Sequence, residues 1–200
     1  GKVSYAFDAG SVHTDGPEDR NGAEGITNFL GSVNYQPIKS LSVKADLFHL
    51  YGKRELMRAL PPAGERYQNT SERYDPIQTT LGVVKAYFRP NDKTSTEAIV
   101  SYADRDSYFY SEPGDPHTTT RDWDYEWNAN LTQAIALSKS NVFRLGGLYN
   151  HWVAPNGKRF YEGKRNDLET FSAVIVDEQR LGSLVLDGGV RWVKTHINDY

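Results

Sequence analysis

The stretch Trp123–Gln133, with the sequence WDYEWNANLTQ, decides the fold class of this chain. Its odd positions up to Leu131 are Trp, Tyr, Trp, Ala and Leu, and its even positions up to Thr132 are Asp, Glu, Asn, Asn and Thr. Successive side chains of a β-strand point to opposite faces, so this pattern separates an apolar set from a polar set. A helix would scatter both sets around its axis. The stretch is therefore predicted to be a two-faced strand.

Eight further segments show a similar alternation, among them Val3–Ala9, Leu41–Leu47 and Leu184–Trp192. In Ile77–Phe88 the alternation is interrupted at Lys85, which predicts a β-bulge there. We expect nine strands of about 9–13 residues each, longer than the mean of about 5–6 in soluble domains. Strands that cross a bilayer at a tilt need about 9–11 residues. The strand lengths therefore favour a membrane barrel over a soluble sheet.

The connections between these segments come in two sizes that alternate along the chain. Four are short, namely Pro37–Ser40, Pro90–Thr94, Ile135–Ser140 and Arg180–Ser183. Four are long and polar, namely His13–Glu24, Gly52–Asp75, Ser111–Asp122 and Val153–Asp167. An up-and-down barrel with tight turns at one rim and long loops at the other has this rhythm. A sandwich with Greek-key connections does not.

Composition excludes several classes of protein. The 200 residues carry a net charge of −3 and no cysteine, so thiolate metal sites, cysteine nucleophiles and disulfides are excluded, and no nucleic-acid signature arises. The longest uncharged stretch, Gly25–Ile38, is shorter than the roughly 18 residues that a spanning helix needs. The aromatic residues comprise 13 Tyr, 4 Trp and 8 Phe. Tyr and Trp, which combine an apolar ring with a polar group, suit the boundary between water and an apolar phase.

The placement of charged residues indicates which face of the strands contacts water and which contacts an apolar phase. Eight charged residues are expected opposite the apolar set: Asp8, Lys44, Asp46, Asp124, Glu126, Arg144, Asp187 and Arg191. The apolar set instead carries Tyr and Trp near the strand ends, with Tyr5, Tyr35 and Tyr87 near the short turns. Near the long loops, the expected membrane-interface aromatics are Tyr51, Tyr102, Trp123, Tyr125, Trp127, Tyr149 and Trp192. Two aromatic belts around an aliphatic band are typical of a barrel surface that faces lipid.

With the strands placed, the chain resembles the barrel of a TonB-dependent outer-membrane receptor. The paired segments Phe171–Arg180 and Leu184–Trp192 are similar to that family's hairpin, in which an aromatic-small-apolar strand ends at Asp-Glu and returns through Leu-rich sequence to Gly, Arg and an aromatic residue. Val12–Gly16 with Asn21-Gly22 resembles a strand rising into an external loop. Phe29–Pro37 resembles the strand that descends from it.

The resemblance implies an all-β, antiparallel, up-and-down transmembrane barrel with 22 strands, of which residues 1–200 are expected to be an interior part of about nine. The family's N-terminal plug domain is not within this stretch. The implied function is active uptake of a scarce nutrient across the outer membrane of a Gram-negative bacterium. A ferric siderophore is the first expectation, with cobalamin, haem or a glycan also possible. The implied partners are outer-membrane lipid and lipopolysaccharide, the plug, and the TonB complex through the N-terminal region.

No catalytic residue, cofactor or metal site is expected. The five histidines are scattered among loops and strand ends without a spaced metal motif, and the chain has no nucleophile elbow. Binding is the remaining chemistry, and aromatic and cationic residues in the long loops are its candidates because rings stack on flat or sugar-like ligands and cations attract anionic chelates. These candidates are Tyr67, Tyr74, Tyr108, Tyr110, Lys158, Arg159, Phe160 and Tyr161. Contact of the same loops with each other or with lipopolysaccharide stays open.

Two other functions remain open at this point. One is a soluble all-β carbohydrate-binding or adhesion module, in which Trp123, Tyr125 and Trp127 would lie against a second sheet. The other is a complete small outer-membrane barrel acting as a pore or an enzyme, in which the first and last strands would pair.

Overall fold

A computed structural model of the chain describes residues 1–17, 22–56, 71–112, 118–157 and 164–199. These residues form one antiparallel sheet of nine strands, and no helix occurs among them. The strands are β1 (Lys2–Thr14), β2 (Glu24–Ile38), β3 (Leu41–Leu56), β4 (Ser71–Asn91), β5 (Thr94–Glu112), β6 (Thr118–Ser138), β7 (Asn141–Ala154), β8 (Asn166–Leu181) and β9 (Leu184–Asp199). The all-β, antiparallel fold expected from the alternation is confirmed.

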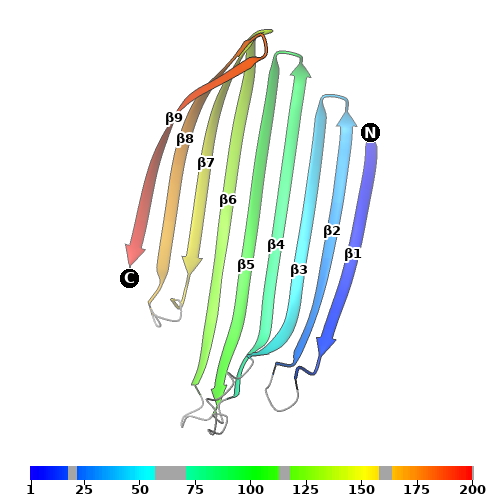
Figure 1. Cartoon of the computed structure of the whole chain (residues 1–200), viewed down its shortest axis with the longest axis vertical. Coiled ribbons are helices and arrows are strands. Elements are labelled where there is room, and N and C mark those ends of the chain that lie inside the picture. Colours follow the sequence, from blue (N-terminus) through cyan, green and yellow to red (C-terminus); the bar gives the residue numbers. More distant parts are fainter. Residues whose placement is uncertain (18–21, 57–70, 113–117, 158–163, 200) are drawn as a thin grey trace.

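The strands lie side by side in the order in which they occur in the sequence, from β1 to β9 (Figure 1). Each strand is antiparallel to the next, so the chain runs up and down without a crossover. The tight turns after β2, β4, β6 and β8 lie at one end of the sheet, at the top of Figure 1. The last residues of β1, β3, β5 and β7 lie at the opposite end. The short connections are therefore all at one end of an up-and-down sheet, as the sequence predicts.

The tight turns are built from residues that supply turn geometry locally. Only two residues separate β4 from β5, and the side-chain oxygen of Asn91 accepts hydrogen bonds from the backbone N–H of Lys93 at 2.8 Å and of Thr94 at 3.0 Å. An Asn at this place mimics a backbone turn. Between β8 and β9, Gly182 has a φ of 67°, which glycine adopts without steric cost.

The strands are longer than predicted. They span from 13 residues in β1 to 21 in β4 and β6, because pairing continues into the segments expected to be loops. β4 begins at Ser71 and β5 ends at Glu112, and these ends pair with each other. Backbone groups at strand ends remain satisfied for as long as a neighbouring strand is present, so polar sequence alone does not end a strand.

The bulge expected at Lys85 is wrong. Lys85 is in regular register with Lys44 on β3 and Ile99 on β5, and its ammonium forms an ion pair with Glu97 at 2.5 Å. It belongs to the polar face of β4, so the alternation is not broken there. Register shifts in this strand occur instead near its two ends, at Tyr74/Ile77 and Phe88/Asn91.

The sheet is open. Within the described part of the chain, strands contact only their neighbours in the sequence, and β1 and β9 form its two edges. A ring closed by pairing of β1 with β9, as a complete nine-stranded barrel requires, is not formed. The buried apolar residues among those described are only Phe109, Val153 and Ala154. The sheet therefore has almost no core of its own.

Candidate functional site

The register gives the sheet one predominantly apolar face. Directly paired residues share a face, and one row of pairs runs from Val33 through Ala45, Val84 and Val100 to Ala129, across β2 to β6. The same row continues through Tyr149 on β7 and Phe171 on β8, and it ends at Lys194 on β9. We call this side of the sheet, with every residue that shares its parity, the apolar face.

The opposite side is the polar face. Its corresponding row pairs Ser32 with Asp46 and reaches Ser101, Asn128 and Asn150. All eight charged residues expected opposite the apolar set lie on this face, as the register requires. One aromatic residue departs from expectation. Tyr87 pairs with Glu97 on the polar face, while its neighbour Phe88 occupies the apolar face.

The apolar face is uncovered within the described part of the chain. Tyr5 is 73% exposed, Leu131 55% and Val190 74%. A compact protein of this mass exposes about 9,500 Å² by the usual scaling, whereas this chain exposes 13,579 Å². Each 100 Å² of apolar surface left in water costs about 2.5 kcal/mol relative to burial. The face therefore requires an apolar environment from outside the described sheet.

The surface of this face is uneven. Two shallow hollows have volumes of about 440 and 550 Å³. Gly31, Ala45 and Gly82 line the first, and Gly147 and Ala173 are among the residues that line the second. Their linings are almost wholly apolar, and larger side chains surround the small ones. Flexible hydrocarbon can follow such relief, whereas a second sheet would have to match it residue by residue.

All seven expected interface aromatics lie on the apolar face. Tyr102 and Trp127 are directly paired and their ring centroids are 4.4 Å apart, and Tyr149 contacts Phe171 at 4.8 Å. Trp192 pairs with Ala173, two residues nearer the short turns than the pair of Tyr149 with Phe171. The rest form a belt that begins near the middle of β5 and β6, at Tyr102 and Trp127, and continues towards the long connections.

Within this belt and beyond it the same face carries charged residues, and Asp104 pairs directly with Tyr125. On β5 and β6, Asp106 pairs in register with Trp123, and Arg121 follows two residues further out. Arg121 donates to both carboxylate oxygens of Asp106, at 2.9 and 2.7 Å. These hydrogen bonds raise the pKa of the Arg121 guanidinium above its ordinary value. Towards the long connections the apolar band is therefore followed by aromatic rings interleaved with charged residues.

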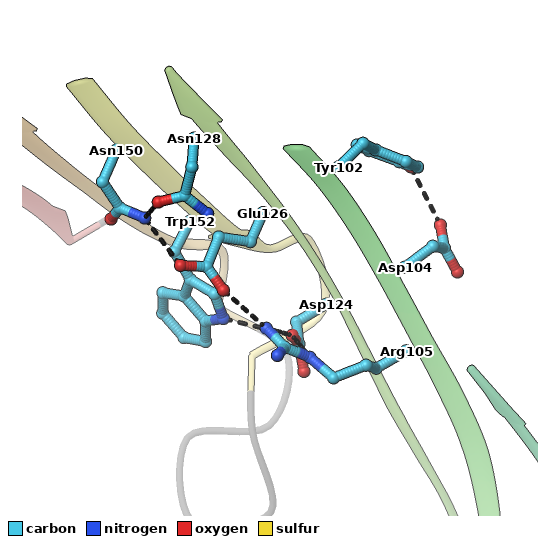
Figure 2. A network of polar contacts seen from close by, with 8 residues as sticks. All are labelled: Tyr102, Asp104, Arg105, Asp124, Glu126, Asn128, Asn150 and Trp152. Carbon is cyan, nitrogen blue, oxygen red and sulfur yellow. Dashed lines mark hydrogen bonds and ion pairs between the residues drawn. The ribbon is translucent and has the colours of Figure 1, made fainter. Parts of the chain in front are cut away.

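A network of polar contacts occupies the polar face near the long connections (Figure 2). Arg105 on β5 donates to Asp124 at 2.7 Å and to Glu126 at 3.2 Å, both on β6. From β7, Trp152 donates its indole N–H to Asp124 at 3.2 Å. Asp124 is only 3% exposed, so the charge of Arg105 offsets the cost of burying this carboxylate.

The network extends along β6 through an amide. Asn150 donates to Glu126 at 2.6 Å and to Asn128 at 2.7 Å. Tyr102 and Asp104 lie apart from this network in Figure 2 and are joined by their own hydrogen bond of 3.1 Å. The arrangement cross-links three strands on the polar face. Its guanidinium, carboxylate, amide and indole groups form hydrogen bonds with one another and suit contact with water or a polar partner.

The structure divides the expected ligand-binding residues. Five of them lie outside the described residues: Tyr67, Lys158, Arg159, Phe160 and Tyr161. Tyr74 contacts the buried ring of Phe109 on the polar face, with centroids 5.2 Å apart. Tyr108 and Tyr110 point to the side of the apolar face, where they meet Arg121 and Arg73. Tyr74 is thus separated from the other two by the sheet itself.

Sequence reasoning assigned Asp124 and Glu126 to the polar face but did not identify the residues that hold them. Arg105 lies in the run Asp104-Arg105-Asp106, and strand parity places it on the face opposite both neighbours. Extending the alternation of β5 beyond Tyr102 would have indicated this. Nothing in the sequence indicates that Trp152 reaches Asp124, because that contact depends on the register of β6 with β7.

The described residues contain neither a long apolar helix nor a cluster of metal-ligating side chains. No helix among them is long and apolar enough to cross a membrane. No group of three or more His, Cys, Asp or Glu side chains in these ranges is placed to hold a metal ion.

Compared with known proteins, the chain matches no protein-family model and no curated protein.

Proposed function

We propose that this chain is part of a β-barrel of a bacterial outer membrane, and that the barrel is a TonB-dependent receptor that imports a scarce nutrient. The observation that carries the proposal is the apolar face: open across the described sheet, bordered by rings such as Tyr102 and Trp127, and charged beyond them. In a bilayer, the apolar residues would contact hydrocarbon, the aromatic rings would lie at the interface, and the charged residues would contact water.

The alternative functions fit the described sheet less well. A soluble carbohydrate-binding or adhesion module needs a second sheet over Trp123, Tyr125 and Trp127, and none occurs in the ranges that the structure describes. A complete small barrel needs β1 to pair with β9, and these strands are the two free edges of the described sheet. Further strands on both edges would satisfy their backbone groups in lipid.

The step from barrel to receptor rests on the resemblance of Phe171–Arg180 and Leu184–Trp192 to the family hairpin. The polar face then lines the interior, where Arg105 and its carboxylate partners face the plug or the solvent around it. Ferric siderophores are the first nutrient class to test, because the expected positive loop near Lys158 and Arg159 attracts anionic chelates. Cobalamin, haem and glycans are the further classes.

Nutrient uptake by a deletion strain tests this proposal. The strain would be supplied in turn with ferric siderophores, haem, cobalamin and glycans as the only source of the relevant nutrient. We expect loss of growth on one class, restored by the gene on a plasmid, and the same loss when the TonB complex is disabled instead. Growth that needs this gene but not the TonB complex would contradict the receptor assignment. Growth on all four classes would contradict import of these nutrients.

A further inference from the structure

The polar face carries a group of apolar side chains on β2, β3 and β4. One row of directly paired residues runs from Leu30 through Phe48 to Leu81. The next two rows towards the long connections add further apolar residues of the same strands. We call this group the hydrophobic patch, and it consists of Ile26, Leu30, Phe48, Leu50, Ile77 and Leu81. Strand parity places all six on the side opposite the apolar face.

The hydrophobic patch is uncovered within the described part of the chain. Leu30 is 45% exposed and Leu81 is 38% exposed. The same face carries Ser, Asn, Lys and Asp in the rows nearer the short turns, so the patch interrupts an otherwise polar surface. Contact with membrane hydrocarbon does not account for it, because the apolar face is on the other side of the sheet. A ligand that covers the patch would remove this apolar surface from water, which favours binding.

Carboxylates lie on both sides of the hydrophobic patch. On β1, Asp8 is paired in register with Leu30. On β6, Glu126 belongs to the same row as Leu30, because that row continues from the patch through β5. Arg105 donates to Glu126 at 3.2 Å and to Asp124 at 2.7 Å, so one cation is shared by two carboxylates.

A third carboxylate near the patch has an acceptor oxygen without a described donor. Asp122 on β6 pairs with Ser107 on β5, and Ser107 pairs with Ile77 of the patch. The Oδ1 atom of Asp122 is buried, and no group in the described ranges donates a hydrogen bond to it. A buried acceptor that lacks a donor costs free energy. An N–H donor or a positive charge supplied by a ligand would therefore be stabilised at this position.

The balance of charge around the hydrophobic patch selects the sign of the ligand. Even with Asp124 left out of the count, Asp8, Asp122 and Glu126 outnumber Arg105 among the described residues that border the patch. Two adjoining ion pairs, Arg54 with Glu24 and Lys44 with Asp46, are each neutral as a pair. Charges beside an apolar surface interact more strongly than charges in bulk water. The border therefore attracts a cation and repels an anionic chelate.

We propose that the nutrient bound at the polar face is an organic cation with an apolar body. The body covers the hydrophobic patch, and the positive or N–H donor groups lie towards Asp122 and Glu126. This inference rests on the proposed import function and narrows its nutrient to one chemical class. It differs from the expectation of an anionic ferric chelate, which depends on Lys158 and Arg159, outside the described residues.

Two dyes that share a ring system and differ in charge test the assignment. The methyl ester of an amino rhodamine is a cation, whereas the methyl ester of fluorescein is an anion at slightly alkaline pH. Each would be titrated with the full-length protein in phosphatidylcholine vesicles, and fluorescence anisotropy would be compared with protein-free vesicles. We expect the rhodamine ester to bind about tenfold more tightly than the fluorescein ester, with the difference falling in high salt. Equal binding, tighter binding of the fluorescein ester, or no binding of either dye because another part of the protein covers the patch would overturn the proposal.

Two leucines with nearly equal exposure provide a matched pair of variants. Leu30 on β2 is 45% exposed on the polar face, and Leu47 on β3 is 46% exposed on the apolar face. We expect Leu30→Ala to weaken binding of the rhodamine ester about three- to tenfold through lost apolar contact, and Leu47→Ala to leave it unchanged. Equal effects of the two changes would contradict binding at the patch.

A second pair of variants tests the role of charge. Glu126→Gln should weaken binding of the rhodamine ester and not of the fluorescein ester, because it removes one negative charge beside the patch. Glu97→Gln is the control, since Glu97 lies on the same face nearer the short turns and is paired with Lys85. It should leave the binding of both dyes unchanged. Unchanged binding of the rhodamine ester by Glu126→Gln would contradict attraction of a cation by this border.

Failure of this inference and failure of the import function give different results. If growth still needs the gene and the TonB complex, but the protein does not prefer the rhodamine ester, only the organic-cation assignment is removed. If the protein prefers the rhodamine ester but supports no nutrient uptake, the import function is removed and the cation site remains.

Discussion

Tyr102 and Trp127 are directly opposite each other on β5 and β6, and their rings lie 4.4 Å apart at an angle of 43°. The hydroxyl of Tyr102 also donates to Asp104 at 3.1 Å. Towards the short turns, the pair is next to Val100 and Ala129 of the apolar band. Towards the long connections, it is next to the carboxylate of Asp104. The pair marks the boundary between the two zones.

We predict that Tyr102 and Trp127 stabilise the sheet cooperatively. A double-mutant cycle with Tyr102→Leu and Trp127→Leu should give a coupling of about 0.5–1.5 kcal/mol, because tilted aromatic pairs contribute this much beyond their buried area. The free energy of unfolding would be measured by urea titration in lipid vesicles. A cycle of Tyr102 with Trp192, which lies four strands away on β9, should be additive. Equal coupling in both cycles would contradict a local ring contact.

A cation in the middle of the apolar face should lower the free energy of unfolding of the protein in a bilayer. Leu131→Arg is expected to lower the free energy of unfolding by about 2–4 kcal/mol in vesicles, since a charge there replaces an apolar group facing hydrocarbon. The control is Asn130→Arg, one residue away on the polar face, which should change it by less than about 1 kcal/mol. Similar effects of the two changes would mean that both faces meet the same environment.

Removing Arg105 should destabilise the polar face through Asp124. Arg105→Gln removes the cation that donates to the buried carboxylate of Asp124 at 2.7 Å, and a loss of about 1–3 kcal/mol in the free energy of unfolding is expected. Asp124→Asn should be less harmful in the Arg105→Gln background than in the parent, because it then removes a charge that Arg105 no longer stabilises. The measurement is the free energy of unfolding of all four proteins. An effect of Asp124→Asn that is the same in both backgrounds would show that the ion pair is not coupled.

Replacing Gly52 by Ala should destabilise the protein, whereas replacing Gly82 by Ala should not. A Cβ at Gly52 would overlap the carbonyl oxygen of Gly25 and lie 2.7 Å from the Cα of Ile26, next to a register shift of β3. Gly52→Ala is therefore expected to cost about 1–3 kcal/mol through displaced backbone. A Cβ at Gly82 meets no atom within 4 Å. Thermal unfolding of the two variants checks this, and equal melting temperatures would count against the close approach.

The strands and their faces were predictable because strand parity is a local property of sequence. Once WDYEWNANLTQ was assigned to a strand, the faces of Trp127 and Glu126 followed from alternation alone. The extent of the strands was not predictable, since Ser71 and Glu112 remain in the sheet through pairing with each other and not through their own preferences. The prediction for Tyr87 is wrong for a simpler reason. Nearness to a turn does not determine the face of a residue, whereas its parity within β4 does.

The binding residues were harder to predict for a related reason. Tyr74, Tyr108 and Tyr110 are all aromatic residues near long connections, and composition does not distinguish them. Their faces depend on parity together with the register shifts near Tyr74 and Gly52. Contacts such as that of Trp152 with Asp124 depend on register between strands, which one sequence specifies only through the packing of whole faces.

The most direct test of the central claim uses the tryptophans of the chain itself, because they lie on both faces of the sheet. Variants that keep only Trp127 or only Trp152, with the other tryptophans replaced by Phe, would be reconstituted in vesicles of lipid brominated on its acyl chains. Bromine quenches an indole that touches the chains. We predict strong quenching of Trp127, on the apolar face, and little quenching of Trp152, on the polar face. Unquenched fluorescence from Trp127, or equal quenching of both, would contradict the membrane-facing assignment.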